Sequence, residues 1–229
     1  MIQAILFDLD DTLYSENEFA LGGYRAVARA VAANGECEYE EAFGCMRNAF
    51  LALSRKDVFP CLMERFPHLS MTLDDMVRVY REHVPEISLF TGYRTLLEEL
   101  GKKYRLGIIT DGLPAVQRGK VRALGIEGLF EKIIYSWDYG KDRQKPHLYP
   151  FTLMLDTLGV PPQSALFIGD NPEKDGVGAR GAGMFYIRVA GGQVKAPPPQ
   201  TFHALPDEIV MENLLQLPQM LVQLARILK

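Results

Sequence analysis

The sequence has few cysteines, no long apolar run and no excess of positive charge, and each absence argues against a class of protein. The three cysteines, Cys37, Cys45 and Cys61, are an odd number without metal-binding spacing. We therefore expect free thiols in a reducing compartment and no disulfide framework. The formal net charge is −4, and no basic patch or stripe suggests a nucleic-acid partner.

The apolar segments are all short. None approaches the ~20 residues that a helix needs to cross a bilayer. The apolar start of the chain stops at Asp8 and carries neither a basic region nor a cleavage site, so it is not typical of a signal peptide. We therefore expect a cytoplasmic protein that binds no membrane. With 48% hydrophobic residues among 229, the chain can bury a sizeable core, as one large domain or as one domain with an insertion.

Buried strands alternate with helices in the first residues and after residue 90. Residues 2–7 form a continuous apolar run that ends in carboxylates, which is typical of a strand buried on both faces. Further strands are expected at 104–110, 132–135, 165–169 and 184–189, separated by helices at 117–124, 150–158 and 175–182. This alternation predicts an α/β fold, with residues 1–14 and 91–229 forming a doubly wound, Rossmann-like parallel sheet.

Residues 15–90 interrupt that rhythm. Apolar positions recur at helical spacing over 19–33, 40–53 and 73–82, and no strand is expected there. Thr72 and Asp75 resemble a capping box at the start of the last of these helices. The segment is therefore interpreted as an inserted all-helical cap domain. Near the end of the chain we expect a proline-containing loop at 191–199, a short strand near 208–210 and a helix at 211–228.

Polar residues cluster where the predicted strands end, and ligands of doubly wound sheets bind outside the carboxyl ends of the strands. Residues 8–12 place three aspartates and Thr12 directly after the first strand. Crowded carboxylates repel one another, so this site needs a cation or raised pKa values. Oxygen ligands suit Mg²⁺, which is typically held by one or two carboxylates with waters and phosphate oxygens.

Three more clusters follow the same rule. Thr110, Asp111 and Gly112 end the second strand, where a hydroxyl and backbone N–H groups could hold phosphate oxygens. The ammonium of Lys145 could offset negative charge, and residues 169–175 bring two more carboxylates, Asp170 and Asp175. Taken singly, each of these is more typical of a helix cap, a turn or a solvated lysine. Their shared order and placement indicate a site.

The order of these residues resembles the four motifs of the haloacid dehalogenase superfamily. The motifs correspond here to Asp8, Asp10 and Thr12, then Thr110, then Lys145, and then Asp170 with Asp175. The position of the insertion, between the first and second motifs, is similar to the helical cap of one large branch of that family. The pattern is specific for the superfamily and says little about the substrate.

The resemblance implies a role for each of these residues. Asp8 would attack phosphorus and form an aspartyl-phosphate. Asp10 would protonate the leaving alkoxide and then take a proton from the hydrolytic water. Mg²⁺ would be held by the Asp8 carboxylate, the Asp10 backbone carbonyl and the Asp170 carboxylate, with Asp175 in support. Thr110 and Lys145 would bind the phosphoryl group and stabilise the charge that develops during its transfer. Asp111 and Gly112 are expected to contact the substrate as well.

The implied activity is Mg²⁺-dependent hydrolysis of a small soluble phosphomonoester, such as a sugar phosphate or a nucleoside monophosphate. The dehalogenases of the family lack the second carboxylate, so Asp10 argues against halide displacement. A phosphomutase remains an alternative, and a non-catalytic phosphate-binding or signalling module is a further one. A cap over the strand ends is expected to limit substrates to small metabolites, and the chain could act as a monomer or a homodimer.

Gly176 to Gly181 match a dinucleotide-binding glycine pattern letter for letter, but they fall within a predicted helix rather than directly after a strand. We expect these glycines to let that helix pack closely on the sheet.

Overall fold

The computed structural model describes residues 1–190 and 209–227, so the loop expected at 191–199 lies outside the described residues. The chain divides into two compact units. The sheet unit comprises Met1–Ser15 and Ser88–Lys229, and the helical unit comprises Glu16–Ile87. In the described part of the chain, no helix combines the length and the apolar character that crossing a membrane requires.

Parallel strands form the centre of the sheet unit. Among the described residues the sheet has six strands in the order β3-β2-β1-β4-β5-β6, and every neighbouring pair runs parallel. They are β1 (Ala4–Phe7), β2 (Arg105–Thr110), β3 (Lys132–Tyr135), β4 (Ala165–Gly169), β5 (Phe185–Val189) and β6 (Val210–Met211). This is the strand order of dinucleotide-binding folds. The predicted α/β fold with a Rossmann-like parallel sheet is confirmed.

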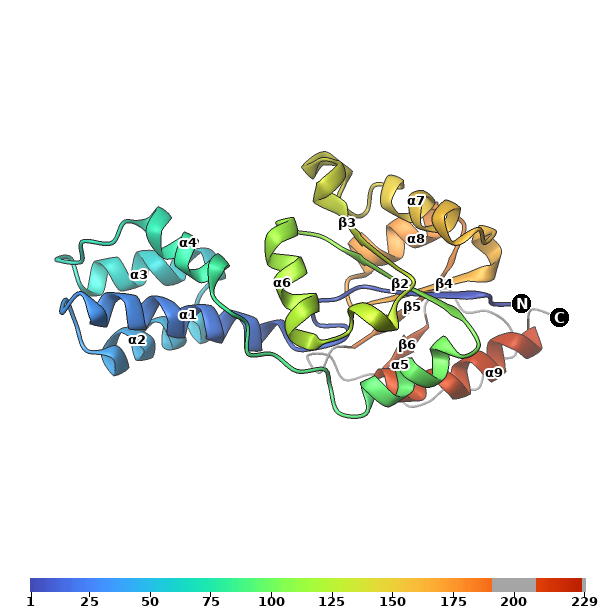
Figure 1. The fold of residues 1–229 in the computed structure, drawn as a ribbon, viewed down its shortest axis with the longest axis horizontal. Helices are drawn as coiled ribbons and strands as arrows, with labels where there is room; N and C mark the ends of the chain where they lie inside the picture. Colours follow the sequence, from blue (N-terminus) through green and yellow to red (C-terminus); the bar gives the residue numbers. More distant parts are fainter. Residues whose placement is uncertain (191–208, 228–229) are drawn as a thin grey trace. The chain divides into compact units, whose positions relative to one another are not determined.

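Helices cover both faces of this sheet (Figure 1). On one face lie α7 (Tyr149–Leu158) and α8 (Val177–Gly181), whose side chains share an apolar core with β1 and β4. A Cβ atom on Gly178 would collide with the Phe151 ring of α7, and one on Gly176 would collide with the Tyr186 side chain of the sheet. These glycines therefore allow close packing on the neighbouring helix as well as on the sheet. On the other face lie α5 (Tyr93–Gly101) and α9 (Leu217–Ile227).

The remaining elements of the sheet unit are α6 (Pro114–Leu124) and several short turns. The turns are η2 (Glu127–Leu129), η3 (Ser136–Tyr139), η4 (Lys141–Arg143), η5 (Pro162–Ser164), the π-helical turn η6 (Pro172–Gly176) and η7 (Leu214–Gln216).

The helical unit contains α1 (Glu16–Ala33), α2 (Tyr39–Ala52), η1 (Arg55–Asp57), α3 (Val58–Arg65) and α4 (Leu73–Glu82). Its core is rich in aromatic contacts, and the ring of Tyr24 lies 5.8 Å from that of Phe59 and 5.3 Å from that of Tyr80. The predicted capping box is confirmed. The Thr72 hydroxyl accepts from the Asp75 amide at 3.2 Å, and the Asp75 carboxylate accepts from the Thr72 amide at 3.3 Å.

The predicted first residues of several helices were wrong, because the spacing of apolar residues does not reveal the features that begin a helix. Helix α1 begins at Glu16 rather than residue 19, because Glu16 and Glu18 favour the positive end of the helix dipole. Helix α6 begins at Pro114 rather than residue 117, since proline is well tolerated in a first turn. The C-terminal helix begins at Leu217 rather than 211, after β6 and η7.

The helix predicted at 175–182 also differs. A π-helical turn, η6, precedes the short α8. The side chain of Asn171 caps this turn by accepting from the amides of Glu173 and Lys174. Asp175 therefore lies inside the turn rather than at a helix end, and its carboxylate is available for the site.

Candidate active site

The candidate site lies where the strand connections change direction along the sheet. Strand β1 lies between β2 and β4, so the chain moves to one side of β1 first and to the other side later. Such a switch point leaves a crevice at the carboxyl ends of the two central strands. Asp8 follows β1 and Asp170 follows β4, so the topology alone brings these two carboxylates to the crevice.

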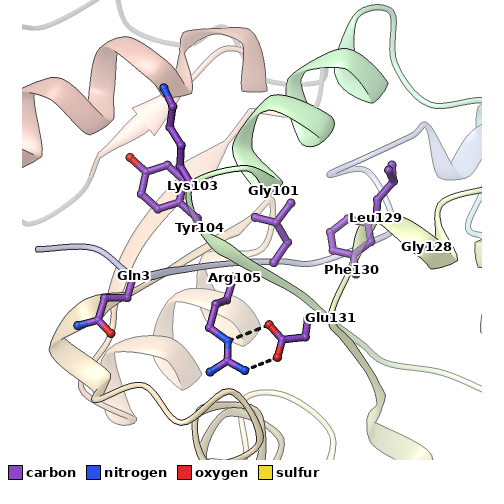
Figure 2. Close-up of a pocket in the computed structure, with 10 residues that line it drawn as sticks. Gln3, Gly101, Lys103, Tyr104, Arg105, Gly128, Leu129, Phe130 and Glu131 are labelled. Carbon is purple, nitrogen blue, oxygen red and sulfur yellow. Dashed lines mark hydrogen bonds and ion pairs between the residues drawn. The ribbon is translucent and has the colours of Figure 1, made fainter.

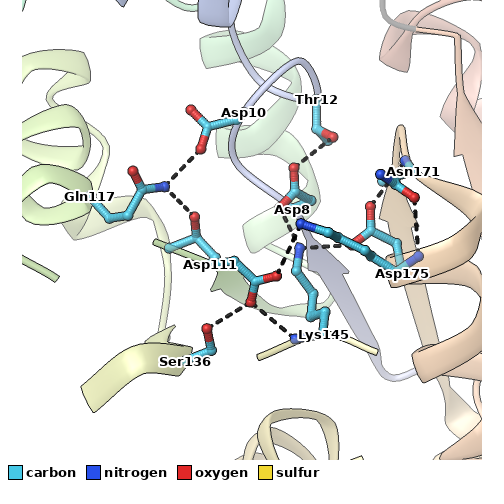
Figure 3. A network of polar contacts seen from close by, with 12 residues as sticks. Asp8, Asp10, Thr12, Asp111, Gln117, Ser136, Lys145, Asn171 and Asp175 are labelled. Atoms are coloured by element: carbon cyan, nitrogen blue, oxygen red, sulfur yellow. Dashed lines mark hydrogen bonds and ion pairs between the residues drawn. The ribbon is translucent and has the colours of Figure 1, made fainter. Parts of the chain in front are cut away.

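The Asp8 carboxylate is buried and held on both oxygens (Figure 3). Its Oδ1 accepts from Lys145 Nζ at 2.5 Å, and its Oδ2 accepts from the Thr12 hydroxyl at 3.3 Å. The same ammonium forms an ion pair with Asp175 Oδ1 at 2.7 Å. One buried lysine therefore links the carboxylate that follows β1 to a carboxylate of η6.

Burial raises the pKa of Asp8 well above its usual value, and the neighbouring charges of Asp175, Asp10 and Asp170 raise it further, against the opposing effect of Lys145. For Lys145, burial lowers the pKa, but Asp175 and Asp8 outweigh it and hold the pKa above the ordinary range. The lysine is thus firmly protonated, yet a single ammonium does not compensate the carboxylates around it.

The carboxylates of Asp8, Asp170 and Asp175 form a group in which one oxygen from each lies within 4.8 Å of the others. Burial, together with the charges of Asp175 and Asp11, raises the pKa of Asp170 to about 6. A glycine at position 169 is required here, because a Cβ atom there would collide with the Asp175 carboxylate. An all-oxygen donor set, in which burial and the neighbouring carboxylates raise the pKa values of Asp8 and Asp170, fits a hard divalent cation.

The Asp10 side chain lies outside this group and contacts α6. Its Oδ1 accepts from Lys120 Nζ at 2.6 Å and from the Tyr14 hydroxyl, and its Oδ2 accepts from Gln117 Nε2 at 2.8 Å. Burial raises the pKa of Asp10, but Lys120 and the hydrogen bonds outweigh burial and lower the pKa below its usual value. Asp10 and Asp8 therefore sit two residues apart in opposite electrostatic environments.

The residue that follows Asp10 has an unusual backbone conformation. Asp11 has a φ of 54°, in the left-handed region that glycine, asparagine and aspartate adopt most readily. An aspartate therefore suits this position of the loop better than most other residues would.

The residues after β2 take different roles. The buried hydroxyl of Thr110 accepts from Gln117 Nε2 at 2.6 Å. The Asp111 carboxylate accepts from the Ser136 hydroxyl at 2.7 Å and from the Lys145 amide at 3.1 Å, so it fixes the backbone that carries Lys145. Gly112, with a φ of 118°, makes the turn into α6.

Most of the residues expected from the sequence thus come together at one edge of the sheet. The sequence interpretation missed Lys120 and Gln117, which are 3% and 2% exposed. A signal was present: both fall on the buried stripe of α6 with Val121 and Leu124, where a polar residue needs a partner. The Asp175 carboxylate, predicted to support the metal site, lies close enough to those of Asp8 and Asp170 to belong to the same candidate group.

A separate hollow lies at the opposite edge of the sheet, where β2 begins (Figure 2). It is lined by residues that include Gln3, Tyr104 and Phe130. Two of its charged residues, Arg105 and Glu131, bind each other, with Arg105 Nε donating to Glu131 Oε2 at 2.8 Å. These two charges are neutralised by one another, so they do not mark a second chemical site.

Comparison with known proteins agrees with this arrangement. Residues 5–189 match the family described as haloacid dehalogenase-like hydrolase. A glyceraldehyde 3-phosphate phosphatase of Methanocaldococcus jannaschii is 29% identical over 214 residues, which cover 85% of this chain and 88% of the relative. A pyrophosphatase of Bacillus pumilus is 31% identical over 176 residues, which cover 74% of this chain and 75% of the relative.

Among solved structures, a 2-haloacid dehalogenase from Pseudomonas syringae superimposes with a TM-score of 0.63 at 27% identity, covering 99% of both chains. The family match includes residues of both the sheet unit and the helical unit. It also includes all of the strand-end residues described above. The chain therefore belongs to the haloacid dehalogenase-like hydrolases.

Proposed function

We propose that this protein is a Mg²⁺-dependent phosphatase that hydrolyses small soluble phosphomonoesters through an aspartyl-phosphate on Asp8. The observation that carries the proposal is the pair of carboxylates after β1. Asp8 contacts Lys145 and belongs to a group of three aspartates that could hold a cation, while Asp10 is bound separately by residues of α6. This arrangement supports different roles for the two aspartates: Asp8 as the nucleophile and Asp10 as the group that transfers protons.

In the first half-reaction, a carboxylate oxygen of Asp8 attacks phosphorus as the bond to the leaving oxygen breaks. The Lys145 ammonium, 2.5 Å from Asp8 Oδ1, would compensate charge on the attacking carboxylate and on the phosphoryl oxygens. The Thr110 hydroxyl accepts from Gln117, which leaves its own hydrogen to donate to a phosphoryl oxygen.

Asp10 would move the protons of both half-reactions. It gives a proton to the leaving alkoxide and later takes one from the water that attacks the aspartyl-phosphate. A halide needs no proton when it leaves. The presence of a second carboxylate, Asp10, therefore supports phosphoester chemistry over halide displacement, although a dehalogenase is among the structural relatives.

Mg²⁺ held by the carboxylates of Asp8, Asp170 and Asp175, with the Asp10 carbonyl as a further ligand, would supply the positive charge that a phosphate dianion needs here. The donor set supports this assignment because burial, together with an excess of carboxylates over ammonium groups, raises the pKa values of Asp8 and Asp170.

Small phosphorylated metabolites are the proposed substrates. The relatives named above act on glyceraldehyde 3-phosphate and pyrophosphate, which are compact anions. We further propose that the helical unit, inserted between the first and second motifs, serves as a cap domain that favours such compact substrates.

The test is phosphate release from a panel of triose phosphates, sugar phosphates, nucleoside monophosphates and pyrophosphate, each with Mg²⁺ and with EDTA. We expect Mg²⁺-dependent release of inorganic phosphate from at least one compact phosphomonoester. A product in which the phosphoryl group has moved to another hydroxyl of the same sugar would identify a phosphomutase instead. Release of halide from 2-haloacids, without release of phosphate, would contradict the proposal.

A further inference from the structure

Two buried residues of α6 hold the Asp10 carboxylate, and neither belongs to the four motifs. Gln117 and Lys120 are three residues apart, so they project from the same face of the helix. Lys120 Nζ lies 2.6 Å from Asp10 Oδ1, and Gln117 Nε2 lies 2.8 Å from Asp10 Oδ2 (Figure 3 shows Gln117 beside Asp10). Burying a lysine costs free energy unless it is paired, and here its partner is a residue of the site.

The hydrogen bonds leave one specific position open on Asp10. Each carboxylate oxygen has two lone-pair directions. Oδ1 accepts from both Lys120 and Tyr14, so both of its directions are taken. Oδ2 accepts from Gln117 alone among the described residues, so one direction is left for a leaving oxygen or a water.

Gln117 also connects the carboxylate to the hydroxyl of Thr110. Its amide nitrogen donates to Asp10 Oδ2 and to Thr110 Oγ1, at 2.8 and 2.6 Å. A carboxylate only accepts hydrogen bonds, so the amide nitrogen and not its oxygen must face Asp10. A single side chain thus sets the orientation of a proton-carrying group and of a hydroxyl at the end of β2.

We propose that Lys120 and Gln117 are positioning residues that fix the Asp10 carboxylate so that Oδ2 is the atom which gives and takes the proton. The proposal rests on the phosphatase function proposed above. As the bond from phosphorus to the leaving oxygen breaks, the proton on Oδ2 passes to that oxygen. As water attacks the aspartyl-phosphate, its proton passes to Oδ2 and the bond from phosphorus to Asp8 breaks.

The two half-reactions depend differently on Asp10 when the leaving group is varied. p-Nitrophenolate leaves without a proton, so formation of the aspartyl-phosphate from p-nitrophenyl phosphate needs no acid. Hydrolysis of the aspartyl-phosphate still needs Asp10 as the base. An alkyl phosphate needs the acid in the first step as well. Loss of a residue that positions Asp10 should therefore slow the first step for an alkyl phosphate but not for p-nitrophenyl phosphate, whereas loss of a residue that only supports the fold should make no such distinction.

The experiment compares Lys120→Met with the wild-type enzyme by stopped-flow and quenched-flow kinetics with Mg²⁺. We expect the burst of p-nitrophenolate to keep its rate within about twofold and to approach one equivalent per active site. Steady-state turnover should fall by about 10-fold or more, as part of the ~10²–10⁴ that acid–base catalysis contributes. An alkyl phosphate should show the same loss of kcat with no burst.

Three variants accompany it. Arg122→Met removes a positive charge from an exposed position of the same helix and should leave both phases unchanged. Lys120→Arg keeps a donor to Oδ1 and should restore part of the steady-state rate. Gln117→Met should show the same split, and it provides the test if Lys120→Met does not fold.

The inference is overturned if Lys120→Met and Gln117→Met slow the burst and the steady state equally, or alter the melting temperature alone. Failure of the proposed function looks different, because the wild-type enzyme itself would then release no phosphate and form no phosphoenzyme.

Discussion

In the sheet unit nine buried side chains are polar or charged, whereas the buried side chains of the helical unit are all apolar or aromatic, within residues 1–190 and 209–227. The nine are Asp8, Thr12, Thr110, Gln117, Lys120, Ser136, Lys145, Ser164 and Asp175. Burying such groups costs free energy unless they are paired. Most of them lie at one edge of the sheet in a single unit. This concentration indicates that the sheet unit carries a chemical site whose polar residues take the place of apolar core residues.

The helical unit is organised differently. Its core combines Tyr24, Phe59 and Tyr80 with aliphatic residues. Several of its cations are engaged within the unit: Arg55 binds Glu16 at 2.5 Å, and the guanidinium of Arg25 lies over the Phe43 ring. A change of one carboxylate should therefore remove catalysis when it is made at the site of the sheet unit, and only some stability when it is made in the helical unit.

The largest expected effect comes from a matched pair of Asp→Asn changes. Asp8→Asn should reduce turnover to the background, because an amide of nearly the same shape is a poor nucleophile. Asp75→Asn in the helical unit should keep the turnover of p-nitrophenyl phosphate and lose only capping and ion-pair stabilisation. Assays at equal concentrations of folded protein measure both. Retention of more than about a tenth of the activity by Asp8→Asn would remove it from the nucleophile role.

Removal of the metal should have a similarly large effect, and it should depend on pH. EDTA is expected to abolish turnover, and Mg²⁺ to restore it. The pKa of Asp170 is raised to about 6 from 3.8, so the metal-free folded state holds a proton that the unfolded chain has released. The metal-free protein should therefore lose stability as the pH rises from about 4 through about 6.

The same protons compete with the metal. Mg²⁺ should raise the melting temperature more at about pH 7.5 than at about pH 5. Thermal melts with and without Mg²⁺ at both values measure this difference. A stabilisation by Mg²⁺ that is independent of pH would contradict the assignment of Asp170 to the metal.

Asp10→Asn should lower kcat by roughly 10²–10⁴, because proton transfer in both half-reactions is lost. The Asp8 nucleophile remains, so a burst from p-nitrophenyl phosphate should persist. Quenched-flow measurement of the burst and of the steady state separates the two. Wild-type turnover of an alkyl phosphate by Asp10→Asn would exclude Asp10 from proton transfer.

The smallest expected effect lies in the helical unit. Thr72→Ala removes the side-chain cap of α4 and should cost about 1 kcal/mol of stability. Denaturant unfolding followed by circular dichroism measures it, with Thr72→Ser as the control that keeps the cap. A fall in kcat on p-nitrophenyl phosphate, at equal folded fraction, would contradict the expectation that changes in the helical unit affect stability and not catalysis.

The sequence predicted the sheet well, because a strand buried on both faces is a continuous apolar run. The bounds of β3 and β4 were predicted to the residue. The strand-end residues were predictable because parallel strands bring their carboxyl ends to one edge, as with Asp8 and Asp170. The short α3 and the turn η6 were missed, because neither is long enough to show a periodic pattern.

The part of the site on α6 could not be read from motifs. Lys120 and Gln117 look like surface residues of a helix until the buried stripe of that helix is known, and their partner Asp10 lies more than a hundred residues away in the chain. Asp111 is a similar case. Its predicted contact with substrate stays a prediction, and its contacts with Ser136 and the Lys145 amide depend on the positions of β3 and the loop that follows it.

The most direct test of the account is to find which residue carries the phosphoryl group during turnover. Acid quenching of the Asp10→Asn variant with substrate and Mg²⁺, followed by peptide mass spectrometry, should show one added phosphoryl group on the peptide that contains Asp8. This added phosphoryl group should be absent when Asp8 is also changed to Asn. A phosphoryl group on any other residue, or steady turnover by the wild-type enzyme with no phosphoenzyme in either protein, would contradict the account.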